Sequence, residues 1–397
     1  MIELHEKYAP ILHFNKDEQF FPMRVDDLLS YSGLYAKDSQ AAIVRPGELT
    51  PELLVKHGAT GQAFVRSVET GPLLGKDVIS QWGDSAVEMV LRWAQGESGG
   101  WSSELAQKTY SWVSAKTRAA ADQFWWNNVI AAAVAGNLQT AAGSELPRLV
   151  LPAATHQNAV ERYRDTTKRA PGYTYYYRYL KDSSYLYLQY WFFYAYNDWG
   201  QAYNGLNDHE GDWESMILFF RLRDDGQPQE PPAYVAYATH ESRIHKPWGH
   251  PDIETVGNHV CGFIGAGSHA TYPQAITYNV SDFYKLYDYA TGDGIVINHD
   301  QWQHRINVSD VPWLAQYQGS WGTRFWLSTA QAKTVLQLAL AATPLSGLIG
   351  LTVQPREFEL PGVSAPRGPA DRGRRQNTDP LGWAGLTETD DDIPFAA

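Results

Sequence analysis

The hydrophobic and polar positions of the chain fall into three blocks. Residues 1–83, and again those from 171 onward, hold short runs of aromatic and β-branched residues between Gly, Pro, Asn and Asp, a pattern typical of strands and turns. The block between them, 84–170, is rich in Ala and Trp and has apolar residues at helical spacing. The pattern therefore predicts an α+β protein. Its β domain is built from 1–83 and 171–380, and a helical insertion at 84–170 interrupts it.

The strongest strand prediction is the aromatic run 185–194. It is apolar on both faces, so we expect it at the centre of a sheet. The other predicted elements come from shorter runs of the same kinds. They are strands at 8–14, 212–220, 233–238 and 260–264, helices at 155–167 and 328–342, a Pro-, Gly- and Arg-rich extended strap from 361, and an acidic tail at 381–397.

A dense polar motif, residues 205–214, stands at the start of one predicted strand. On a strand, Asp212 and Glu214 point to the same face. Gly211 can break the chain direction just before the strand and bring His209 to the same pocket. Two carboxylates and an imidazole at a strand end predict a divalent-metal site for Mg²⁺, Mn²⁺ or Ca²⁺. The competing interpretation is a solvated acidic turn.

Other predicted strands also end in polar residues. Asn197 and Asp198 follow the central strand, His240 follows the strand at 233–238, and His269 follows the strand at 260–264. If these ends meet at one rim of the fold, the acids of the motif face several imidazoles. We therefore predict that His240, His269 and Glu214 carry the chemistry of the site.

Composition narrows the choice of partner. The net charge is −12 and no basic stretch could follow a nucleic-acid backbone, so nucleic acid is not expected as a partner. The heavy load of 15 Trp, 24 Tyr and 14 Phe suits a β-rich fold or a pocket for apolar groups. The sequence shows neither a secretory signal nor an apolar segment long enough to span a bilayer, which predicts a cytoplasmic protein, with export by a signal-free route as the alternative.

The single cysteine, Cys261, excludes an intrachain disulfide framework and a zinc site built from cysteines. It lies in the apolar run 259–264. We therefore expect an inert buried thiol at this position.

Several segments resemble one known family, that of vacuolar protein sorting-associated protein 62 (Vps62). The resemblance rests on residues 8–10, 18–22, 191–197, 208–214, 265–273, 319–322 and 366–369, which follow the family order. The helical block 84–170 is the part least like that family. Membership would leave the chemistry open, because a fold can host many functions.

A more distant similarity is to the necrosis- and ethylene-inducing (NLP) cytolysins. Their heptapeptide Gly-His-Arg-His-Asp-Trp-Glu aligns its first His, its Asp and its Glu with His209, Asp212 and Glu214. This resemblance implies a β-sandwich with a divalent metal at one rim, held by these three residues and by Asp198 as the counterpart of an upstream Asp. Glu210 and Gly211 replace the Arg-His pair of the cytolysins, a departure that bears on recognition of a lipid headgroup.

Three functions fit these features. The first is a metal-dependent hydrolase of an ester or phosphoester of an apolar or lipid-like small molecule, with His240 or His269 moving the proton. The second is a cytolysin-like protein that binds a membrane surface or a sphingolipid through the cation. The third is a non-catalytic trafficking module whose metal is structural. The sequence leaves the oligomeric state open.

Overall fold

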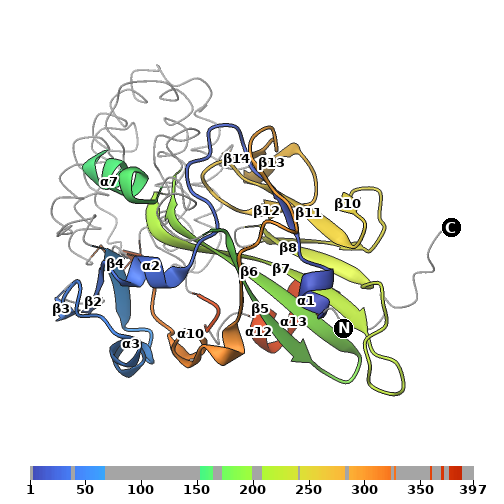
Figure 1. Ribbon diagram of the computed structural model, residues 1–397, viewed down its shortest axis with the longest axis horizontal. Coiled ribbons are helices and arrows are strands. Elements are labelled where there is room, and N and C mark those ends of the chain that lie inside the picture. Colours follow the sequence, from blue (N-terminus) through green and yellow to red (C-terminus); the bar gives the residue numbers. More distant parts are fainter. Residues whose placement is uncertain are drawn as a thin grey trace, which may run out of the picture.

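The computed structural model describes residues 3–36, 41–67, 153–163, 172–198, 208–239, 242–281, 286–322, 326–327, 358–359, 368–370 and 375–386. In these residues the fold is mostly β, with several separate sheets and a few short helices (Figure 1). No helix in the described ranges has the length and apolar character needed to cross a bilayer.

Most of the predicted helical insertion lies outside the described residues. Within it, α7 (Ala153–Tyr163) overlaps the helix expected at 155–167. The helix expected at 328–342 and the end of the acidic tail, 387–397, also lie outside. The start of the tail is described and is structured, because α13 (Pro380–Ala384) extends into it and Leu386 is buried.

The largest sheet has six strands, ordered β16-β5-β6-β7-β8-β9. They are β16 (His304–Asn307), β5 (Thr174–Lys181), β6 (Tyr185–Asn197), β7 (His209–Arg221), β8 (Tyr234–Thr239) and β9 (Ser242–Pro247). The prediction for 185–194 is confirmed, since β6 lies in the middle of this sheet and is buried along almost its whole length. Its antiparallel register with β7 pairs Asn197 with His209, so the polar ends of the two longest strands lie side by side.

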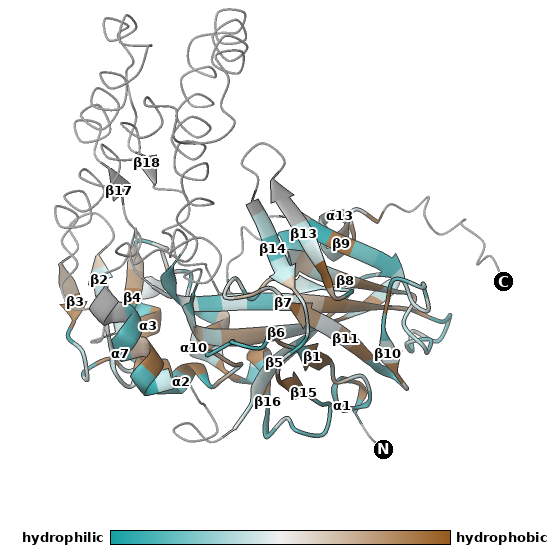
Figure 2. Ribbon diagram, turned by 90° about the horizontal axis from the view of Figure 1, so that it is seen from above, coloured by the Kyte–Doolittle hydropathy of each residue, from teal (hydrophilic) through white to brown (hydrophobic). Residues whose placement is uncertain are grey.

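A second sheet has the order β10-β11-β1-β15, with β12 paired to β11. Its strands are β10 (Thr255–Val256), β11 (His259–Ile264), β1 (Ile11–His13), β15 (Val296–Ile297) and β12 (Thr271–Tyr272). Leu12 and Val260 from this sheet lie in one buried cluster with Phe192 and Leu218 of the larger sheet. The two sheets therefore share a core, and Figure 2 shows hydrophobic colour on strands of both.

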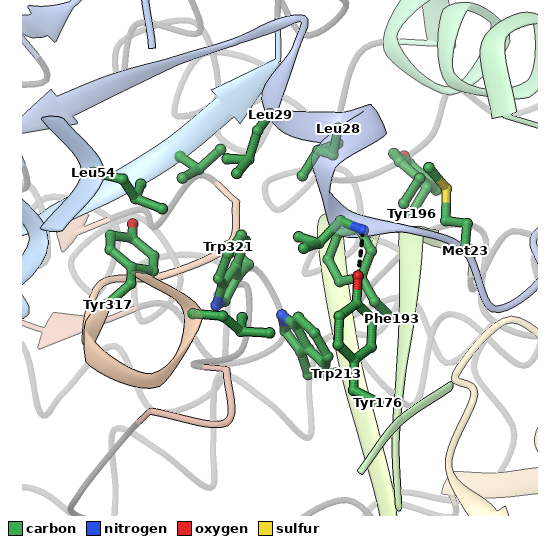
Figure 3. Packing of buried hydrophobic residues seen from close by; sticks show 14 of the residues in the cluster. Met23, Leu28, Leu29, Leu54, Tyr176, Phe193, Tyr196, Trp213, Tyr317 and Trp321 are labelled. Carbon is green, nitrogen blue, oxygen red and sulfur yellow. Dashed lines mark hydrogen bonds between the residues drawn. The ribbon is translucent and has the colours of Figure 1, made fainter. Parts of the chain in front are cut away.

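The opposite face of the six-stranded sheet is covered by shorter elements. The strands are β3 (Ala42–Val44), β2 (Ser32–Ala36) and β4 (Ala63–Ser67), and the helices are α2 (Val25–Leu29), α10 (Pro312–Gln316), α12 (Arg375–Thr378) and α13. Figure 3 shows the cluster at its centre, where Trp213 of β7 packs against Phe193 of β6 and against Trp321. Tyr176 fastens α2 to this face, because its hydroxyl accepts a hydrogen bond of 2.8 Å from the amide of Val25.

The remaining elements lie at the edges of the molecule. They are α1 (Leu4–Lys7), α3 (Pro51–Gly58), the 3-10 turn Val308–Asp310, the hairpin of β13 (Ile276–Ser281) and β14 (Leu286–Ala290), and the pair β17 (Trp326–Leu327) and β18 (Phe358–Glu359). In Figure 1 the β13–β14 hairpin stands beside β11 and β12, while α7 and β4 stand near the end of β6 that carries Asn197.

The N-terminus of α13 is capped by a side chain. The Asp379 carboxylate accepts a hydrogen bond of 2.9 Å from the Gly382 amide, and it pairs with Arg375 at 2.6 Å. We expect Asp379→Ala to lower the free energy of unfolding by about 1 kcal/mol, the usual effect of losing an N-cap. Chemical denaturation measures it, and Asp379→Asn is the matched control because Asn caps equally well. Equal losses in both variants would contradict a capping role.

Candidate functional site

The candidate site lies where β6 and β7 bring their polar ends together. Asp212 pairs with Tyr194 across the ladder, and Glu214 pairs with Phe192. The strand was expected to begin at Asp212, but β7 begins at His209, so most of the motif lies within the strand. Gly211 adopts the left-handed region, φ 59°, without ending the strand. Gly211 was expected just before the strand, but it lies inside the ladder.

The loop that follows β11 brings His269 to this place. Its Gly267 carbonyl accepts a hydrogen bond of 2.8 Å from the Asp198 amide, and the Gly267 amide donates to the Glu18 carboxylate at 3.2 Å. His269 itself has φ 57°, which is rare for a residue with a side chain. The loop is thus fastened both to the end of β6 and to the turn that carries Glu18.

The His269 ring is enclosed on all sides and held between two carboxylates. Its Nδ1 donates to Asp212 Oδ2 at 3.1 Å, its Nε2 lies 3.6 Å from Glu18 Oε1, and its side chain is 0 % exposed. It stacks on Tyr194 with the ring centroids 3.9 Å apart. Burial alone would lower the pKa of His269, but the charges of Glu18 and Asp212 and their hydrogen bonds raise it to about 9. The ring is therefore an imidazolium at neutral pH.

Glu18 is held in its charged form by the same contacts. Its Oε1 accepts hydrogen bonds from the amides of Gln19 and Phe20 at 2.8 and 3.0 Å. Burial opposes ionisation, yet the His269 charge and these amides leave the pKa of Glu18 lowered. A raised pKa at His269 and a lowered pKa at Glu18 are both expected when the two charges pair, so these residues form a buried ion pair.

A second histidine and carboxylate lie beside the first pair. Asp198, which is 4 % exposed, accepts a bond of 2.7 Å from His156 Nε2 of α7. Asn197, the residue before Asp198, contacts the first group, because its amide nitrogen is 3.4 Å from both Asp212 Oδ2 and the Ser268 carbonyl. Helix α7 thus contributes to the site across the end of β6.

His209 is the neutral imidazole of the cluster. It is buried, and burial lowers its pKa even though the nearby charge of Asp212 acts to raise it. A neutral imidazole is the form that binds a metal. Glu214 is half-buried. Burial raises the pKa of Tyr194, and the charge of Glu214 raises it further. At Tyr272 burial and Asp288 raise the pKa more than Glu214 does.

The structure thus gathers most of the residues that the sequence singles out. Asp212 is hydrogen-bonded to His269, and Asp198 reaches the loop of His269 through its backbone amide. His209 lies within electrostatic reach of Asp212, and Glu214 follows Asp212 by two residues on β7. His240 lies outside the described residues. Neither Glu18 nor His156 was predicted at the site. The only signal for Glu18 was its place in a turn that carries the family resemblance, and His156 had none.

The donor types suit a divalent cation, but the spacing is not that of a formed metal site. Carboxylate oxygens and a neutral imidazole are ligands of Mn²⁺, Mg²⁺ or Ca²⁺ sites. The Oδ2 atoms of Asp212 and Asp198 already accept hydrogen bonds from histidines. In the described part of the chain, the group whose ligand atoms all lie within 4.8 Å of one another is His13, Glu254 and Cys261, not the predicted set. The predicted metal site therefore stays a prediction.

Comparison with known proteins returns no relative by sequence. No family model matches the chain and no curated protein matches it, so the Vps62 resemblance stays a prediction.

Among solved structures the chain is similar to NLP proteins. A necrosis- and ethylene-inducing protein 2 from the causal agent of cocoa's witches' broom disease aligns at 14% identity over 49% of this chain and 71% of that one, with a TM-score of 0.25. NLPPya in complex with glucosamine aligns at 11% identity over 44% of this chain and 59% of that one, with a TM-score of 0.23. At such scores the likeness carries no argument about this chain, and its function is inferred from the site itself.

Proposed function

We propose that the rim at the ends of β6 and β7 recognises the polar headgroup of a membrane lipid through a bound divalent cation. The supporting observation is the place of Asp212 and the neutral His209 on β7, beside the end of β6 that Asp198 follows. Carboxylate oxygens bind hard cations, and such a cation still accepts oxygens from a phosphate or a sugar. Of the functions that the sequence suggests, the cytolysin-like one agrees best with this chemistry.

The hydrolase hypothesis is less well supported because of the state of His269. A general base has to be deprotonated and within reach of the substrate. His269 is fully enclosed and positively charged at neutral pH, with Asp212 on one side of the ring and Glu18 on the other. Its contacts suit a group that positions Asp212. The other predicted proton carrier, His240, lies outside the described residues, so hydrolysis stays an untested prediction.

When bound, the cation would supply a positive charge for the headgroup oxygens. Asp212, Asp198 and His209 would hold it. Glu214, which is half-buried and follows Asp212 by two residues on β7, would be a further ligand. His269 would orient Asp212 through its 3.1 Å hydrogen bond, and Asn197 would support the same carboxylate from β6. We also infer that the two large sheets are the layers of a β-sandwich, because their inner side chains form one cluster.

Liposome flotation tests this proposal. We expect the protein to float with phosphatidylcholine liposomes that contain phosphatidylserine or a glycosphingolipid when Ca²⁺ or Mg²⁺ is present, and to remain unbound in excess chelator. Glu214→Gln should weaken the binding by about tenfold, the size of effect that even outer-shell changes have at metal sites. Glu48→Gln, at an exposed turn, is the matched control.

Two results would overturn the proposal. One is the absence of flotation with every lipid and cation. The other is flotation that chelator leaves unchanged, which would show that lipid binding does not depend on a cation. Chelator-sensitive turnover of an ester or phosphoester without liposome binding would favour the hydrolase. A large fall in melting temperature on metal removal, with neither binding nor turnover, would favour a structural metal.

A further inference from the structure

A second group of potential ligands lies on the smaller of the two sheets, away from the shared core. In the parallel register of β1 and β11, Ile11 pairs with Cys261 and His13 pairs with Phe263. Ile11, Cys261 and Phe263 share one cluster, while Leu12 and Val260 belong to the cluster between the sheets. His13, two residues from Ile11, therefore points to the same outer face as Cys261.

The third member comes from the segment before β10. The Cys261 amide donates a hydrogen bond of 2.9 Å to the Glu254 carbonyl, which fixes these two residues as cross-strand neighbours. Ligand atoms of His13, Glu254 and Cys261 all lie within 4.8 Å of one another. The two sides of the β10–β11 hairpin supply oxygen and sulfur, and the distant β1 supplies nitrogen, to one small volume.

The polar atoms of this group are not engaged elsewhere. In the described parts of the chain, Glu254 and Cys261 form hydrogen bonds through backbone atoms. No hydrogen bond there is formed by the His13 ring, the Glu254 carboxylate or the Cys261 thiol. The His13 ring is held by stacking on Phe263, with centroids 4.7 Å apart. Its pKa is lowered by burial, so the imidazole is neutral and able to coordinate.

We propose that His13, Glu254 and Cys261 bind a Zn²⁺-type ion. Zinc takes this mixture of imidazole nitrogen, carboxylate oxygen and thiolate sulfur, and three protein ligands leave its fourth position for water or another small ligand. A thiolate disfavours Ca²⁺ and Mg²⁺, which prefer oxygen. Glu254 is exposed and Cys261 is fully buried, so the open position lies on the solvent side. One cysteine rules out a cysteine-rich zinc site but not this mixed one.

Binding has to displace a proton. Burial, with a smaller contribution from Glu254, raises the pKa of the Cys261 thiol to about 12, so without metal the sulfur carries its hydrogen at neutral pH. When the metal–sulfur bond forms, the S–H bond breaks and one proton passes to solvent. Metal uptake should therefore release a proton and should strengthen as the pH rises.

Cobalt is a sensitive probe for this site. Because Cys261 is the sole cysteine of the chain, a sulfur-to-cobalt charge-transfer band can come from no other residue. We expect Co²⁺ added to chelator-treated full-length protein to produce that band, and Zn²⁺ to remove it by displacement. Cys261→Ala should abolish the band. His13→Ala and Glu254→Gln should each weaken Co²⁺ binding by about tenfold or more.

The controls separate this site from the rim at β6 and β7. His57→Ala, which removes a half-buried histidine on α3, should leave the band unchanged. A cation bound only at the rim would still bind in Cys261→Ala but would give no sulfur band in any protein, and that result would overturn the proposal. A band that survives both His13→Ala and Glu254→Gln would overturn it too. These two variants keep the test decisive if Cys261→Ala does not fold, since His13 and Glu254 are not fully buried.

Discussion

His269→Ala should lower the free energy of unfolding by about 3–5 kcal/mol, the usual loss when one partner of a buried ion pair is removed. The ring is 0 % exposed and separates the carboxylates of Glu18 and Asp212, whose side chains are each 4 % exposed. Without the imidazolium the two negative charges face each other in a space with little water. Urea denaturation followed by tryptophan fluorescence measures the loss.

A rescue experiment separates this electrostatic effect from the loss of ring packing. In the His269→Ala background, Glu18→Gln with Asp212→Asn removes both buried charges and should recover part of the stability. The ring packing on Tyr194 stays lost in every variant, so the recovery reports the charges alone. His57→Ala should change the stability by less than about 0.5 kcal/mol, as expected for a position without such partners. A triple variant no more stable than His269→Ala would show that packing causes the loss.

The sequence predicts the positions of the strands better than it predicts how those strands pair. A strand buried on both faces is mostly apolar, and the run that became β6 is apolar or aromatic apart from Gln189 and the terminal Asn197. β8 and β11 fall within a residue of the runs 233–238 and 260–264. The pairing of strands does not follow from such runs, because contacts like β1 with β11 join residues about 250 positions apart, as Ile11 and Cys261 do.

The sequence predicted those residues of the candidate site that stand at strand ends. His209, Asp212, Asp198 and His269 could be proposed because each follows or begins a strong strand, and the β6–β7 register places His209 and Asp212 beside the end of β6. Glu18 and His156 come from a turn and from a helix of the insertion. Their place at the site depends on how those segments pack, which the local pattern does not encode. The protonation of His269 also depends on that packing, because without Glu18 the charge on the ring would have one partner fewer.

Gly211→Ala should lower the free energy of unfolding by about 3–5 kcal/mol, because two separate effects add at this position. The residue has φ 59°, a conformation that disfavours a side chain. A Cβ built on it would also lie 1.9 Å from the Trp321 carbonyl oxygen. That oxygen belongs to the backbone, so the clash can be relieved only by moving the segment of Trp321 or β7 itself.

Gly249→Ala is the matched control for the first effect alone. Gly249 has φ 81°, and a Cβ there would meet nothing within 4 Å, so we expect a loss of about 1 kcal/mol from backbone strain. Thermal and urea denaturation of both variants give the difference, which measures the close approach to Trp321. Equal losses would contradict that contribution. Because Gly211 stands between His209 and Asp212, a shift of β7 in the surviving folded protein should also weaken cation-dependent liposome binding, whereas Gly249→Ala should leave it unchanged.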